Sequence, residues 1–108
     1  MRTVMLREER RGPDQRFLWA YVDELGNLHI DGQDLGPGTA AGSSDGEYEW
    51  FQTIAANDIA RVVELLAGET TDGVLDLLER DWLGERTYEL EKRLRESDIE
   101  IRLSTWTG

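Results

Sequence analysis

The apolar residues of this 108-residue chain change their spacing near residue 55, and this change constrains the fold most. Before it, apolar side chains alternate with others, as in the strands of a sheet. After it, they recur at i, i+3, i+4 and i+7, as along one stripe of a helix. Strands grouped before helices are typical of an α+β structure whose helices cover one sheet face. The sequence therefore predicts a single α+β domain over residues 1–108.

The strand pattern is clearest at residues 16–23, where Phe17, Trp19 and Tyr21 alternate with three other apolar residues. Further strands are expected at residues 3–7, 28–30, 48–54 and 99–106. These segments predict an antiparallel sheet of about four to five strands. The charged run at residues 7–14 contains Gly12 and Pro13 and predicts a solvated loop.

Three helices are expected between the fourth strand and the last one. The first covers residues 59–66, the second runs from an N-cap at Thr71 to Trp82, and the third covers about residues 86–96. The predicted order is therefore strand, strand, strand, long loop, strand, three helices, strand. The helices should pack mainly on one face of the sheet.

The large aromatic residues are assigned to surface or core by their segments. Trp19, Trp82 and Trp106 are expected in the core or at the contact between helices and sheet. In the fourth strand, Phe51 is expected in the core, while Tyr48 and Trp50 face the other way and are expected to be partly exposed.

No Lys or Arg occurs between Phe17 and Ala60, although this segment holds eight carboxylates. The formal charge of the whole chain is −11. Direct binding to a nucleic-acid backbone or to an anionic membrane is disfavoured, because both need clustered cations. Such a charge attracts cationic partners instead.

Residues 31–47 contain five Gly residues and only one large apolar residue, Leu35, so they predict a long Gly-rich acidic loop. The loop and the adjoining strand combine carboxylates with aromatic rings, which suits recognition of Arg or Lys on a partner protein. The residues predicted to bind the partner are Asp31, Asp34, Asp45, Glu47, Tyr48, Glu49 and Trp50.

These features favour a non-enzymatic module that binds a basic protein surface. An immunity-like protein, or an inhibitor that mimics nucleic acid at the binding site of a cationic toxin nuclease, would be of this kind. We expect no catalytic residue, no metal and no cofactor in such a module.

Two alternatives stay open at this point. His29 and Asp31 lie on one side of an extended segment, and Asp34 follows closely, so the three predict the centre of a small metal- or ligand-dependent enzyme. The spacing of Asp31 and Asp34 does not match an EF-hand calcium loop, because Gln33, Leu35 and Gly42 occupy ligand positions. The second alternative is a structural subunit of a homo-oligomer.

Other features concern the compartment. The chain has no Cys, so disulfides and thiolate metal sites are excluded. Residues 1–30 lack the basic start and apolar run of a signal peptide, and no long apolar run occurs. We therefore expect a cytoplasmic protein.

The segment Asp31-Gly-Gln-Asp34-Leu-Gly-Pro-Gly, followed by Tyr48-Glu-Trp50-Phe51 and the helix at Ile59, resembles a group of small acidic uncharacterised actinobacterial proteins. The resemblance extends over nearly the whole chain. It implies no activity and no catalytic residues.

Overall fold

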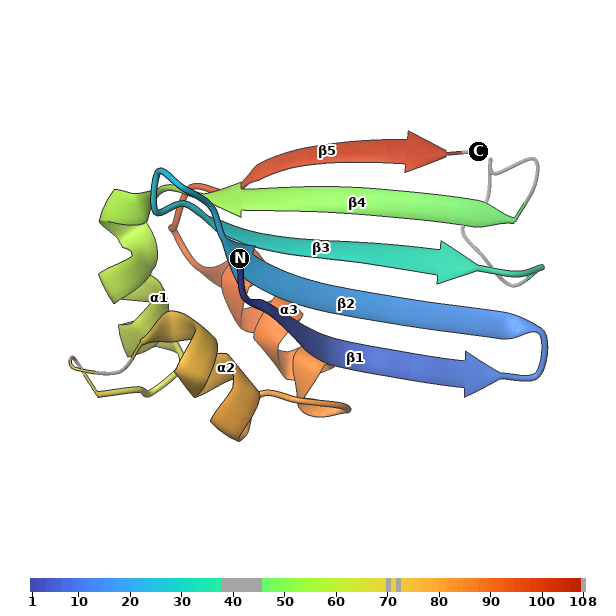
Figure 1. The fold of residues 1–108 in the computed structure, drawn as a ribbon, viewed down its shortest axis with the longest axis horizontal. Coiled ribbons are helices and arrows are strands. Elements are labelled where there is room, and N and C mark those ends of the chain that lie inside the picture. Colours follow the sequence, from blue (N-terminus) through green and yellow to red (C-terminus); the bar gives the residue numbers. More distant parts are fainter. Residues whose placement is uncertain (38–45, 70, 72, 108) are drawn as a thin grey trace.

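The computed structural model describes residues 1–37, 46–69, 71 and 73–107, which form a sheet and three α-helices (Figure 1). The strands are β1 (Thr3–Arg11), β2 (Asp14–Val22), β3 (Leu28–Leu35), β4 (Glu47–Ile54) and β5 (Arg102–Thr107). A 3-10 turn, η1 (Ala56–Asp58), leads into α1 (Ile59–Leu65), followed by α2 (Val74–Asp81) and α3 (Arg86–Glu96). The predicted α+β class and element order are confirmed.

The sheet has the simplest possible order, β1-β2-β3-β4-β5, and every neighbouring pair is antiparallel. The first four strands follow one another as hairpins. The chain then forms all three helices before β5 returns to pair with β4. Figure 1 shows α3 behind the strands, so the helices lie toward one face of the sheet. No helix in the described ranges is long and apolar enough to cross a membrane.

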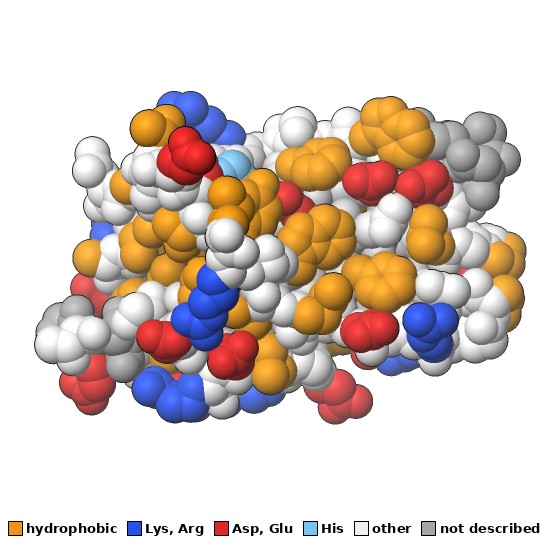
Figure 2. All heavy atoms as spheres, in the orientation of Figure 1, with side chains coloured by type: hydrophobic (Ala, Val, Ile, Leu, Met, Phe, Trp, Pro, Cys, Tyr) orange, Lys and Arg blue, Asp and Glu red, His pale blue; other side chains and the backbone are white. Residues whose placement is uncertain are grey.

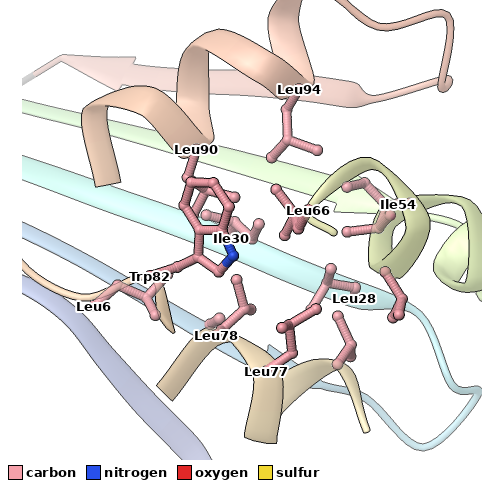
Figure 3. Close-up of a cluster of buried hydrophobic side chains, with 14 of the residues drawn as sticks. Leu6, Leu28, Ile30, Ile54, Leu66, Leu77, Leu78, Trp82, Leu90 and Leu94 are labelled. Atoms are coloured by element: carbon pink, nitrogen blue, oxygen red, sulfur yellow. The ribbon is translucent and has the colours of Figure 1, made fainter. Parts of the chain in front are cut away.

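The core lies between the sheet and the helices (Figure 3). Alternate strand residues such as Leu18 and Ile30 point toward the helices and are fully buried. Leu78, Trp82 and Leu90 meet them from the helical side. Burial of each such side chain contributes about 1.5–3 kcal/mol, so this cluster dominates the stability of the fold. The prediction that Trp82 belongs to the core is confirmed.

β1 continues to Arg11, so the loop predicted at residues 7–14 is wrong except for the turn at Gly12 and Pro13. Backbone hydrogen bonds to β2 hold this charged segment extended, and charged side chains are common on a strand at the edge of a sheet. A bulge between Met5 and Arg7 shifts the register, and both Leu6 and Arg7 are buried as a result.

β3 continues to Leu35, which pairs with Glu47 at the start of β4. The loop predicted at residues 31–47 is therefore wrong at both ends, and Asp31 and Asp34 are strand residues. The N–H of Gly36 donates to the carbonyl of Gly46 at 2.7 Å and closes the hairpin. Backbone pairing with β4 explains why a segment so poor in apolar residues is extended. Residues 38–45 lie outside the described residues.

Two other predicted boundaries differ from the structure. Gly73, and not Thr71, is the N-cap of α2. β5 begins at Arg102, because Ile99 packs into the core before the strand starts.

Candidate functional site

The strand register divides the side chains of the sheet between two faces. Leu18 and Ile30 face the helices, so the residues one position away face the opposite side. We call this side the open face, because no helix of the described chain covers it (Figure 1). Two rows of side chains cross its centre: Trp19, Asp31, Phe51 and Ser104 in one, and Phe17, Gln33, Glu49 and Trp106 in the next.

Aromatic side chains occupy much of the open face, and Figure 2 shows them gathered over the strands with acidic groups between them. Phe17, Trp19, Tyr21 and Phe51 are half-buried, and Trp106 on β5 is 50% exposed. Single exposed apolar residues are ordinary, whereas a contiguous group of rings marks an interaction surface. The core positions predicted for Trp19, Phe51 and Trp106 are wrong, because helices cover only the other face.

Glu47 and Glu49 lie side by side along the open face of β4. The Gln33 side-chain amide donates to Glu47 at 2.9 Å and to Glu49 at 3.5 Å. Burial, followed by the adjacent Glu47, raises the pKa of Glu49. Two carboxylates that crowd one another are stabilised by an approaching cation.

Asp31 lies at the centre of the open face and is only 5% exposed. It is directly opposite Trp19 on β2 and Phe51 on β4. Its Oδ1 accepts a hydrogen bond of 3.3 Å from the backbone N–H of Gln52. Burial raises the pKa of Asp31, and hydrogen bonds from Gln52 and from the Tyr21 hydroxyl, together with His29, oppose this shift.

His29 is fixed by its neighbours on the open face. Its Nε2 lies 2.7 Å from Asp23 Oδ2, and its Nδ1 lies 3.3 Å from the Thr53 hydroxyl. The ring stacks on Tyr21 with centroids 4.5 Å apart and planes within 5°. Both ring nitrogens therefore have protein partners, and the role of His29 in the β2–β3 hairpin is structural.

The seven residues predicted to bind a partner do not form one surface. Asp31, Glu47 and Glu49 lie on the open face, whereas Asp34, Tyr48 and Trp50 lie on the face toward the helices. The two groups alternate along β3 and β4, because successive residues of a strand point to opposite faces. In a loop, these residues could all have faced one side. Asp45 lies outside the described residues.

Asp34, Tyr48 and Trp50 lie half-buried on the face toward the helices, where Trp50 packs against the core. The rings of Tyr48 and Trp50 stack with centroids 5.6 Å apart. Burial raises the pKa of Asp34, and the charges of Arg16 and Arg7 oppose the shift. This carboxylate therefore has arginines of its own chain nearby.

The structure does not bring His29, Asp31 and Asp34 together, because Asp34 points to the opposite side of β3. Asp23, which sequence reasoning did not single out, bonds His29 instead. Within the described ranges, no three His, Asp or Glu side chains lie close enough to hold a metal ion. The geometry expected for an enzyme centred on these residues is absent from the described chain.

Sequence reasoning missed Phe17, Trp19 and Trp106 as surface residues. Their alternation does place Phe17 and Trp19 on one side of β2. The pattern carries no sign of which side the helices cover, because both sides of β2 are apolar.

No protein-family model, curated protein or solved structure matches the chain. The resemblance to small acidic actinobacterial proteins stays a prediction.

Proposed function

We propose that this protein is a non-enzymatic binding module whose open face binds a basic surface of another protein. One observation carries the proposal: aromatic rings and carboxylates share a sheet face that the described helices leave uncovered. No Arg or Lys lies on the open face of β2, β3 or β4. The arginines on this face of the described strands are Arg10 and Arg102, near its ends.

The two kinds of side chain have different roles in such binding. Phe17, Trp19 and Trp106 supply apolar area that a partner removes from water, which gives most of the affinity. Glu47 and Glu49 attract a cationic surface and orient it, which speeds association and selects the partner. Neither role needs a reactive group.

A partner with a nucleic-acid-binding surface has the required charge. An immunity-like role, in which the open face occupies such a surface on a toxin, is one form of the proposal. A cytoplasmic site of action is part of the same proposal and depends on the sequence alone.

The experiment begins with affinity capture at low salt, using the wild-type chain and a Glu47→Gln/Glu49→Gln variant. A captured partner is then purified, and its dissociation constant is measured by calorimetry. We expect the double variant to bind at least about tenfold more weakly, and binding to weaken as salt rises from about 50 mM to about 500 mM.

The matched control is Glu64→Gln/Glu96→Gln, which removes the same charge from exposed positions on α1 and α3. It should change the dissociation constant less than about threefold. Equal losses in both double variants would mean that only net charge matters, and the open face would not be the binding site.

A homo-oligomer is the second candidate, because β5 is an edge strand on which Leu103 is 61% exposed. If two copies paired through their β5 edges, Leu103 would be covered, and the two acidic open faces would not stack against each other. Light scattering in high salt tests it. A dimer that Leu103→Lys abolishes would support this candidate, and a monomer at every salt and protein concentration would exclude it.

A further inference from the structure

Asp31 is a buried carboxylate that no Arg or Lys of the described residues accompanies. It is 5% exposed, and its hydrogen-bond donors are the neutral Gln52 N–H and Tyr21 hydroxyl. The His29 ring, which lies nearby, already bonds Asp23. Buried charges in proteins are normally paired, because an unpaired one has lost its water without compensation. Within the part of the chain that the structure describes, Asp31 therefore lacks an Arg or Lys to balance its charge.

Two other aspartates, one in β3 and one in the turn between β2 and β3, have different surroundings. Asp34 has the charges of Arg16 and Arg7 close by on the opposite face. Asp23 receives hydrogen bonds from the N–H groups of Leu25 and Asn27 and pairs with His29. Asp34 Oδ1 has no hydrogen-bond partner in the described ranges but lies near these arginines, whereas Asp31 accepts hydrogen bonds and has no Arg or Lys of the described residues near it. Asp31 also lies on the face that the described helices leave open.

The neighbours of Asp31 suit a flat cation. Trp19 and Phe51 flank it on the adjacent strands, two strand spacings or about 9.5 Å apart. A planar group between two rings needs about 7 Å, twice an ordinary contact distance. Trp19 and Phe51 are half-buried beside Asp31 on the open face, which no helix of the described residues covers.

We propose that Asp31 receives the guanidinium group of an arginine from the partner, held between Trp19 and Phe51. This inference deepens the proposed function and depends on it. Guanidinium is planar, stacks on aromatic rings and is weakly hydrated, so it enters such a site more readily than the ammonium of lysine. It can donate two parallel hydrogen bonds to one carboxylate.

The test uses N-acetyl-arginine methylamide as a probe, with the citrulline and lysine analogues for comparison, in NMR titrations of the full chain. The arginine probe should shift the Trp19 indole and Phe51 ring signals saturably, with a dissociation constant in the millimolar range. The citrulline analogue, which has the same shape without the charge, should cause no saturable shift. The lysine analogue should bind several-fold more weakly.

Asp31→Asn keeps the shape of the side chain and should weaken the arginine probe at least about tenfold. Trp19→Leu keeps the carboxylate, removes one ring and should also weaken binding. Asp34→Asn, on the opposite face, is the matched control and should bind like the wild type. No saturable shift at Trp19, or equal binding by wild type and Asp31→Asn, would overturn the inference.

A polylysine titration separates this inference from the proposed function. The arginine site alone is overturned by the following result: polylysine binding falls in Glu47→Gln/Glu49→Gln and is unchanged in Asp31→Asn, and the arginine probe has no effect. If neither polylysine nor the arginine probe perturbs the open face, both are contradicted. Binding of the arginine probe that depends on Asp31 supports both.

Discussion

The indole of Trp50 lies directly on Gly32, its partner across the β3–β4 pair, so closely that a methyl group at residue 32 would come within 2.1 Å of Cζ2. Gly32 is therefore required by contact with a neighbouring side chain. The backbone at this position is ordinary strand.

Gly32→Ala should lower the free energy of unfolding by about 1–3 kcal/mol, because the alanine methyl group forces Trp50 out of its place against the core. Urea unfolding measures the change. The double variant Gly32→Ala/Trp50→Leu should lose less than the sum of the two single variants. Additive losses would show that the two residues do not conflict.

A buried ion pair joins β1 to α3, since Arg7 donates to Glu91 at 2.7 Å and to the Thr87 hydroxyl at 3.1 Å. Glu91→Ala should cost about 3 kcal/mol, because it leaves the buried arginine charge without the carboxylate that it bonds. Arg7→Met/Glu91→Leu should recover most of this loss. Glu89→Ala, which breaks the exposed pair with Arg93, should cost no more than about 1 kcal/mol and serves as the control. Equal losses from Glu91→Ala and Glu89→Ala would contradict the buried role.

Asp31→Asn should raise the melting temperature at pH 7. Burial raises the pKa of Asp31, so its ionised form opposes folding. This opposition is full above the pKa of the folded state and disappears as the pH falls below the ordinary aspartate value of about 3.8. Thermal unfolding from pH 7 to pH 3.5 should therefore show the two melting temperatures converging. If Asp31→Asn were less stable than the wild type at pH 7, the hydrogen bonds that the carboxylate accepts would outweigh the cost of burying its charge.

Asp23 should show the reverse dependence. The hydrogen bond with His29, helped by the N–H groups of Asn27 and Leu25, lowers the pKa of Asp23. Its contribution to stability is complete above the ordinary aspartate value and is lost as the pH falls through the lowered one. Asp23→Ala should therefore lower the melting temperature at pH 7 and have a smaller effect near pH 3.

Glu24→Ala, in the same turn, is the control for Asp23→Ala and should leave the melting temperature nearly unchanged. Two variants that behave alike at both pH values would show that the bonds of Asp23 do not hold the hairpin.

The arrangement of strands and helices could be predicted because it follows from the local spacing of apolar residues. Leu18 and Ala20 alternate with aromatic residues, and Ile59, Val62 and Val63 form a helical stripe. Spacing also separates the two sides of β2. Which side the helices cover depends on long-range packing, so local spacing predicts a core position for Trp19 although it lies on the open face.

The extent of the strands and the division of the site could not be predicted from local spacing. Leu35 is extended because its backbone pairs with Glu47, and this pairing leaves no pattern in the side chains. Arg7 is buried because a bulge one residue earlier turns it toward α3. The Gly-rich composition predicts Asp31 and Asp34 together in a loop, whereas strand geometry places them on opposite faces.

The most direct test of the central claim maps where a cationic partner binds. A short arginine-rich peptide is titrated into the isotopically labelled chain at low salt, and the shifted NMR signals are assigned. We expect shifts at Trp19, Phe51 and Trp106 on the open face, none at the buried Trp82, and weaker binding in high salt. Shifts confined to α1, α2 and α3, or an affinity that does not fall in high salt, would contradict the account.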